Sequence, residues 1–309
     1  MKKLRLFLVE TICLAAITCP LQAQQPSAPR VPVSIVVSIE PKRGKTIPPI
    51  EPADIVVSQG KDKRPITGFE PAGQTAMQLL LLLDDSARTT FDTEIPTLQR
   101  FLNALRADTE VAVAYMRNGM AEFTQKFTRD HAAAANSVRI ALGAGGADVS
   151  PYDSLTDAIK KWPAGNVPRK EVVMISSGIE VLGGGYMPDN PYVNAGIASA
   201  QKAGVVVYTI YDPSVGHLGH GLWRNTWGQN FLSQLSDETG GEFYAIGFGA
   251  PVSFQPFLDQ IRSQMQHQYV LTFDAKPEQK SGLQPIRVSI LEKDASIAAP
   301  DKVFVRASM

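Results

Sequence analysis

Five consecutive leucines, Leu79–Leu83, constrain the fold more than any other stretch of the chain. A strand without polar alternation is buried on both faces, as in a parallel sheet covered by helices. Further apolar runs, VAVAYM, VVMIS and VVVYTIY, begin at Val111, Val172 and Val205. Segments of helical periodicity separate these runs. The alternation predicts an α/β fold with a doubly wound, mostly parallel sheet.

The helices between these strands are predicted from apolar residues three and four positions apart. In the first helix, Ile95, Leu98 and Leu102 share one face, and Asp92 or Thr93 is the expected N-cap. Later helices are expected in AAAANSVRIAL, SLTDAIKKW, VNAGIASAQKAG, FLSQLSDETGG and FLDQIRSQM, and an edge strand is expected in EFTQKF.

Both ends of the chain read differently, as strands in which apolar and polar residues alternate. The segments are VPVSIVVSIE and DIVVSQGKDKRPITGF at one end, and QYVLTF, PIRVSIL and KVFVRA at the other. Neither set makes a stable sheet alone, so we expect one small β module formed by the N- and C-terminal segments. The predicted boundaries are a signal peptide at 1–23, a linker at 24–32, N-terminal module strands at 33–75, an α/β domain at 76–266 and C-terminal module strands at 267–309.

The first residues have the features of an export signal. Lys2, Lys3 and Arg5 precede an apolar stretch, and LQA, ending at Ala23, is the expected cleavage site. The stretch is too short to span about 30 Å of hydrocarbon. We therefore expect export to the periplasm or the extracellular space, with no membrane span after signal removal.

Both cysteines, Cys13 and Cys19, lie within that segment, so the mature chain would contain no disulfide. Lipid attachment at Cys19 stays an alternative, although the residues before it fit a lipobox poorly. The composition also bears on partners. Lys plus Arg and Asp plus Glu each number 30, which gives a formal net charge of zero. A nucleic-acid-binding protein needs a basic surface, so this composition argues against that class.

Polar residues follow the five leucines directly, in the sequence DDSAR from Asp84 to Arg88. Open α/β sheets bind ligands at the carboxyl ends of their strands, where this motif is expected. Here the sequence resembles the von Willebrand factor A (VWA) domain, in particular the exported bacterial type called the acidobacterial VWFA-related domain. The pieces that carry the resemblance are, in order, IEPADIVVSQGKDKRPITGFE, LLLLLDDSAR, FLNALRADTEVAVAYM, FTRD, RKEVVMISSGIE, AGVVVYTIYDP, LSDETGGEFY and QYVLTF. The resemblance implies a VWA-like sheet of about six strands.

The resemblance also implies a metal-ion-dependent adhesion site. Members of the family hold a divalent cation with an Asp-x-Ser-x-Ser loop, a Thr from a second loop and an Asp from a third, and the open coordination position takes a carboxylate of a partner protein. Asp84 and Ser86 match the first two positions, whereas Arg88 stands at the second Ser position. Ser150 lies near the Thr position, and Ser177 occupies the Asp position of the third loop. Asp84 and Ser86 are thus the remaining metal candidates.

Three interpretations of this acidic loop stay open. In the first, the site is degenerate, and the Arg88 guanidinium replaces the cation by pairing with Asp84 or Asp85. In the second, an atypical site still binds Mg²⁺ through the oxygen ligands that a hard cation prefers. In the third, Asp84 and Ser86 only cap the next turn or helix.

Other candidates lie in the loops that follow later strands. His217 and His220 have a spacing that binds zinc on a helix, but their glycine-rich surroundings favour a flexible loop. Trp223 and Trp227 fall in what reads as an irregular loop at the sheet end. They are either contact residues for a partner or fold back over the core.

Together these features predict an exported, non-enzymatic protein-binding domain with a degenerate metal-ion-dependent adhesion site and no required cofactor. The expected partner is another protein, and no particular oligomeric state is predicted. A Mg²⁺-dependent adhesion domain is the first alternative. A hydrolase using Ser176, Ser177 or the two histidines is the alternative of another class, although no G-x-S-x-G elbow surrounds the serines. The expected binding residues are Asp84, Asp85, Ser86, Arg88, Ser150, Ser177, Trp223 and Trp227.

Overall fold

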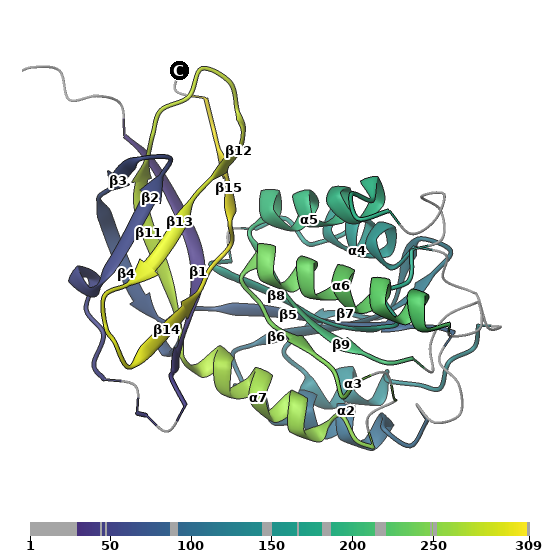
Figure 1. Cartoon of the computed structure of the whole chain (residues 1–309). Coiled ribbons are helices and arrows are strands. Elements are labelled where there is room, and N and C mark those ends of the chain that lie inside the picture. Colours follow the sequence, from purple (N-terminus) through teal and green to yellow (C-terminus); the bar gives the residue numbers. More distant parts are fainter. Residues whose placement is uncertain are drawn as a thin grey trace, which may run out of the picture.

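The structure, a computed structural model, describes residues 30–43, 45–46, 48–86, 92–143, 150–165, 167–180, 187–213, 221–247, 249 and 252–307. An α/β domain lies at one end of the molecule and a β module at the other (Figure 1). The predicted fold class is therefore confirmed. The predicted signal peptide, the two cysteines, Arg88, His217 and His220 lie outside the described residues.

The α/β domain is built on a six-stranded sheet with the order β10-β9-β8-β5-β6-β7. All neighbouring strands are parallel except β6 and β7, which are antiparallel. Every residue of β5 is buried, as expected of a strand with helices on both sides of its sheet. The strands are β5 (Met77–Asp84), β6 (Glu110–Arg117), β7 (Met120–Thr128), β8 (Arg169–Ser176), β9 (Val205–Tyr211) and β10 (Phe243–Tyr244).

Helices cover both faces of this sheet, each over its own apolar core (Figure 1). One face carries α4 (Pro151–Lys160), α5 (Pro191–Ala203) and α6 (Leu222–Thr239). The other carries α2 (Ile95–Asn103), α3 (His131–Asn136) and α7 (Gln255–Gln266). Among the described residues, no helix has both the length and the apolar character needed to cross a membrane.

Two helix boundaries differ from the prediction. The N-cap of α2 is Glu94 rather than Asp92 or Thr93. Helix α3 ends at Asn136, so the VRIAL part of its predicted sequence is not helical. The reason is a tertiary contact: the Tyr115 hydroxyl donates to the carbonyl of Arg139 at 2.6 Å and accepts from its N–H at 2.8 Å. These bonds replace the ones that a continuing helix would make.

The β module pairs the two ends of the chain, as predicted. Strand β1 lies antiparallel to β11, from Val31 opposite Ala275 to Ser38 opposite Gln268, and β2 pairs with β13. Alternation along the strands buries one face of each sheet in a shared apolar core. The module strands are β1 (Val31–Pro41), β2 (Ile55–Gln59), β3 (Asp62–Arg64), β4 (Ile66–Pro71), β11 (Gln268–Ala275), β12 (Gly282–Pro285), β13 (Arg287–Ile290), β14 (Ala295–Ala298) and β15 (Lys302–Val305).

A buried arginine lies where the module meets the α/β domain. The chain crosses between the two parts twice, from β4 through the 3₁₀ turn η2 (Ala72–Gln74) into β5, and from α7 into β11. Arg169 donates to a carbonyl on each crossing, those of Ala72 at 3.4 Å and Met265 at 2.9 Å. It also pairs with Glu171 at 2.9 Å and donates to the side chain of Gln268. Arg169, the first residue of β8, therefore bonds both crossings to that strand, inside the central sheet.

Candidate binding site

The strand order places the topological switch point of the sheet between β5 and β8. The chain leaves β5 toward the face that carries α2 and leaves β8 toward the face that carries α5. Ligands of such sheets bind in the crevice outside the strand ends at this point. Asp84 ends β5 and Ser176 ends β8, so both stand at the crevice, at the end of the sheet opposite the β module (Figure 1).

The acidic loop after β5 turns its two aspartates to different partners. Asp84 Oδ1 accepts from the N–H of Ser86 at 2.9 Å and from its hydroxyl at 2.5 Å. Asp85 Oδ1 instead accepts from Arg139 Nη1 at 2.7 Å and from the N–H of Leu142 at 3.0 Å. All three loop residues are almost completely buried. Hydrogen bonds from Ser86 and the Arg139 guanidinium therefore offset part of the negative charge, while Asp85 Oδ2 is buried without a hydrogen-bond partner among the described residues.

The arginine found at Asp85 is Arg139, which the sequence interpretation did not consider. Its guanidinium lies 3.9 Å above the ring centroid of Tyr115, a cation–π contact, and still reaches Asp85. Among the described residues, Asp85 pairs with Arg139. The expected pairing of Arg88 with Asp84 or Asp85 concerns a residue that lies outside the described part of the chain. Arg139 is 54 positions from Asp85 in the chain, so only the fold brings them together.

The loop after β8 supplies a carboxylate that the sequence interpretation missed. Glu180, buried to 2% exposure, accepts from the Ser150 hydroxyl at 2.5 Å. Ser150 is the N-cap of α4, and its hydroxyl oxygen also accepts from the N–H of Asp153 at 3.1 Å. The signal was present in the sequence SSGIE, where Glu180 follows Ser177 by three positions. The third loop therefore carries a carboxylate, displaced from the position that Ser177 occupies.

Close backbone packing holds this loop against α6. Gly178 has a φ of +68°, and a Cβ built on it would lie 2.3 Å from the carbonyl oxygen of Gly228. Tyr152 fixes the loop from α4, because its hydroxyl donates to the carbonyl of Gly178 at 3.0 Å. Burial, and secondarily the charge of Glu180, raise the pKa of Tyr152 well above its usual value. Tyr152 therefore remains a protonated donor at any physiological pH.

The oxygens at this end are the donor type that Mg²⁺ prefers, but they are engaged with one another. The carboxylates of Asp84 and Glu180 each accept from a serine hydroxyl, and the Ser150 oxygen also caps a helix. No group of three or more His, Cys, Asp or Glu side chains in the described part of the chain is placed to hold a metal ion. Ser177 is also neutral where the family places a carboxylate, so the donors present differ from those of a complete adhesion site.

The two tryptophans lie on a helix, so the expectation of an irregular loop was wrong. Both belong to the first turns of α6, which starts at Leu222 directly after Gly221. Trp223 is 76% exposed, whereas Trp227 packs on the core with its ring 5.9 Å from that of Phe231. Each tryptophan therefore fits one of the two expectations. Trp227 packs over the core, whereas Trp223 points to solvent, where a contact residue for a partner is expected.

Exposed apolar side chains gather at the same end of the sheet. Nine large apolar residues in the described part of the chain are between 49% and 98% exposed, and eight of them lie in segments that follow the carboxyl ends of strands or precede the helices that start there. Only Leu291 lies elsewhere, in the β module. We call the eight residues the apolar rim: Met120, Ile140, Leu142, Met187, Leu222, Trp223, Ile246 and Val252.

The serines of the hydrolase alternative lie in the same region. Ser176 Oγ accepts from the N–H of Gly178 at 3.0 Å, and Ser177 Oγ accepts from the N–H of Ile179 at 3.5 Å. Both serines are buried, with exposures of 0% and 3%. In the described part of the chain, neither hydroxyl bonds to a side chain that would serve as a general base. Their visible role is to shape the turn after β8.

No family model and no curated protein matches the chain. Among solved structures, the BatB protein of Bacteroides thetaiotaomicron is similar at 15% identity and a TM-score of 0.44, over 61% of this chain and 98% of that chain. The PilB minor pilin of Streptococcus sanguinis has 16% identity and a TM-score of 0.41, over 67% of this chain and 63% of that one. The SpRpn10 VWA domain has 13% identity and a TM-score of 0.42, over 60% of this chain and 94% of that one. Likenesses of this size carry no argument about function.

The topology itself is what identifies the architecture. The strand of this sheet that comes first in the sequence, β5, lies in the middle. One edge strand, β7, is antiparallel to its neighbour, and helices cover both faces. An acidic turn follows the central strand β5 at the switch point. The chain has a VWA-like α/β fold, joined to a β module built from both of its ends.

Proposed function

We propose that this protein is an exported, non-enzymatic binding domain that recognises another protein through the apolar rim, without a metal ion. One observation carries the proposal: eight of the nine exposed large apolar side chains in the described residues lie at the ligand-binding end of the sheet. Exposed apolar residues at the ligand-binding end of a sheet are candidates for contact with a protein partner. Tryptophan is also enriched among the residues that dominate binding energy at protein interfaces. Trp223 is the one aromatic residue among the eight described residues of the rim, and it is 76% exposed.

The metal-independent part of the proposal rests on the donor set. Ser177 is neutral where the family places a carboxylate, and Arg88 adds a positive charge at the second Ser position. Asp84 and Glu180 already accept hydrogen bonds from serine hydroxyls, which offsets part of the negative charge that would attract a cation. One observation favours the Mg²⁺-dependent alternative, namely that Glu180 returns a carboxylate to the third loop.

Export rests on the N-terminal sequence, in which three basic residues precede an apolar stretch and LQA. N-terminal sequencing of the protein from its native host should begin at Gln24 or within a few residues of it. Recovery of intact Met1 in the cytoplasm would refute this part of the proposal.

The rim is tested by a double variant, Leu222→Ser with Trp223→Ser. Both side chains are at least 66% exposed, so we expect little change in folding. The matched control is Leu291→Ser, which removes a 63% exposed leucine from the β module. The assay measures capture of envelope proteins by each purified variant.

Truncating two central contact residues at a protein interface costs about 2 kcal/mol or more, which is about thirtyfold in affinity. We therefore expect the rim variant to lose the captured partner while the control retains it. If the rim variant and the parent capture the same partner equally well, the rim is not the binding surface.

A further inference from the structure

Strand β1 has an edge that no described strand covers. Strand β11 pairs with one edge of β1 from Val31 to Ser38. On the other edge, β14 pairs only with Ser38–Pro41. Strand β15 follows β14 in the chain but pairs with β12 instead of continuing along β1. No described strand therefore pairs with this edge of β1 from Val31 to Val37, which we call the open edge, although Ile35–Val37 are buried and Val36 packs in the core of the α/β domain.

The open edge offers backbone hydrogen-bonding groups. The N–H of Ile39 donates to the carbonyl of His267 at 3.1 Å, next to β11, so odd-numbered residues of β1 face that strand. Backbone groups alternate between the two edges of a strand. Ser34 and Val36 therefore present an N–H and a carbonyl to the open edge, whereas Pro32 presents only a carbonyl. The proline restricts pairing without abolishing it.

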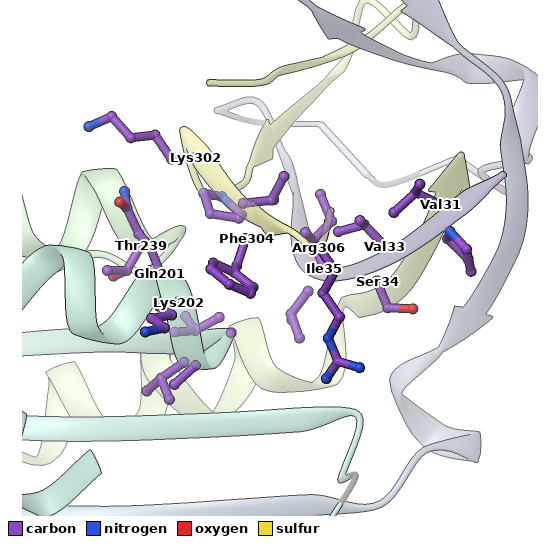
Figure 2. Close-up of a pocket in the computed structure, with 18 of the residues that line it drawn as sticks. Val31, Val33, Ser34, Ile35, Gln201, Lys202, Thr239, Lys302, Phe304 and Arg306 are labelled. Atoms are coloured by element: carbon purple, nitrogen blue, oxygen red, sulfur yellow. The ribbon is translucent and has the colours of Figure 1, made fainter. Parts of the chain in front are cut away.

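A cavity of about 710 Å³ coincides with this edge. Its lining includes Arg30 and every residue of β1 from Val31 to Val36, which is the unpaired stretch of β1 except Val37. The opposite wall is made by the end of α5 and by β15 (Figure 2). The cavity therefore borders the open edge of β1.

The charged side chains that line the cavity all have one sign. Four cationic side chains line it, and no Asp or Glu does. Two of these cations are paired with carboxylates outside the cavity: Arg30 with Asp274 at 3.8 Å and Lys302 with Glu238 at 3.4 Å. The other two, Lys202 and Arg306, form no ion pair among the described residues.

Lys202 and Arg306 stand on opposite sides of an aromatic ring. Figure 2 shows Phe304 projecting from β15 into the cavity, with Lys202 on the α5 side and Arg306 toward β1. Lys202 Nζ lies 5.5 Å from the centroid of the Phe304 ring. Both cations are exposed, and neither forms an ion pair among the described residues. Each can therefore pair with a ligand carboxylate without first breaking an ion pair within the protein.

We infer that this cleft binds an acidic segment of a partner protein in an extended conformation, added as a strand to the open edge of β1. Open edges accept strands through main-chain hydrogen bonds, and side chains then supply specificity. Side chains of a strand alternate, so acidic residues at every second position face one wall of the cleft. Lys202 and Arg306 pair with those carboxylates. This site lies where the β module meets the α/β domain, at the end of the central sheet opposite the apolar rim, and is independent of it (Figure 1).

The test uses the full chain and fluorescence anisotropy with the labelled peptide acetyl-TEVEVE-amide. Two matched peptides carry lysine in place of glutamate, or N-methyl groups on alternate amides. We expect the acidic peptide to bind at least about tenfold more tightly than the lysine peptide, because like charges oppose the latter. We expect N-methylation to weaken binding by a similar factor, because it removes main-chain donors.

The protein variants are Lys202→Glu combined with Arg306→Glu, and the control Lys160→Glu. Lys160 is exposed in the last turn of α4, as Lys202 is in the last turn of α5, but it does not line the cavity. The double variant should lose at least about tenfold in affinity for the acidic peptide, and the control should match the parent. Circular dichroism verifies that each variant is folded.

Three results would overturn the inference. The first is no binding of the acidic peptide by the parent chain. The second is equal binding of the N-methylated peptide, or equally effective competition by inositol hexakisphosphate, which would reveal a plain anion site. The third is binding to phosphatidylglycerol vesicles, lost in the double variant, in the absence of strand-like peptide binding. That result would assign the cations to a membrane surface.

Discussion

Replacing Arg169 with methionine should uncouple the two parts of the fold. Arg169 is 2% exposed and Glu171 is fully buried, and they form an ion pair at 2.9 Å. The same guanidinium donates to the carbonyls of Ala72 and Met265, one on each chain crossing between the module and the α/β domain. The substitution Arg169→Met keeps an unbranched apolar stem, although a shorter one, and removes every one of these donors.

The expected loss follows from the charge left behind. Removing one partner of a buried ion pair costs about 3–5 kcal/mol, because the remaining charge is uncompensated. For a chain of this size, that loss lowers Tm by about 10 °C. Combining Arg169→Met with Glu171→Gln removes the stranded charge, so the double variant should recover about half of the loss or more. The Met265 carbonyl and the Gln268 side chain still lack the donor that Arg169 supplied, which keeps the recovery incomplete, whereas the Ala72 carbonyl retains Arg106 and Thr75 as donors.

The pH dependence has a definite sign. Burial raises the pKa of Glu171, and the charge of Arg169 opposes that rise. Without Arg169 the pKa rises further, so the folded state holds a proton that the unfolded state releases above about pH 4.3. Stability therefore falls as pH rises from that value to the raised pKa, by up to about 1.4 kcal/mol per pH unit. The double variant should show none of this additional slope.

Urea unfolding of the parent and both variants, at pH 5 and pH 8, measures these differences. The single variant should be the least stable, and more so at pH 8. A loss below about 1 kcal/mol, well short of the cost of stranding a buried charge, would refute the reasoning. So would a double variant no more stable than the single one, because the stranded charge would then not be the cause.

Three further outcomes are expected. Gly178→Ala should cost more than about 2 kcal/mol in thermal unfolding, because its Cβ meets the Gly228 carbonyl, while the control Gly73→Ala, with no atom within 4 Å, should cost little. Deleting residues 280–309 removes the strands paired with β1 and β2, so hydrogen exchange in both should accelerate; slow exchange in β2 after the deletion would contradict a shared module. By isothermal titration, the parent should bind Mg²⁺ weakly or not at all, and Arg88→Ser with Ser177→Asp should create measurable binding, because each changed unit charge at about 4 Å is worth roughly 4 kcal/mol at an effective dielectric constant of 20. Tight binding by the parent, or none by the double variant, would contradict this.

The elements that carry a strong periodic signal were predictable. Leu79–Leu83 are buried on both faces, and burial of that kind leaves a continuous apolar run in the sequence. The alternating strands at the two chain ends were also readable, and their pairing followed from the need of each for a partner sheet. In both cases, one residue pattern corresponds to one kind of packing.

The contacts of the site were not predictable, because they depend on residues distant in sequence. Arg139 reaches Asp85 only because Tyr115 holds it there. Glu180 was overlooked because the family motif places its third-loop carboxylate at the position of Ser177, and Glu180 lies three residues after that position. The start of α6 lacked an apolar stripe, since Gly228 and Asn225 are buried where the loop after β8 packs closely on the helix. A close backbone approach selects small residues and thereby erases the usual helical pattern.

The most direct test of the central claim is the affinity for the purified partner, once captured, measured with EDTA and with Mg²⁺. The comparison includes the parent, the Leu222→Ser, Trp223→Ser double variant and the Leu291→Ser control. Recognition through the apolar rim without a metal predicts the same Kd in EDTA and in Mg²⁺ for the parent and the control, and a Kd at least about tenfold weaker for the rim variant in both. A parent whose binding is abolished by EDTA and restored by Mg²⁺, with the rim variant unaffected, would contradict the account.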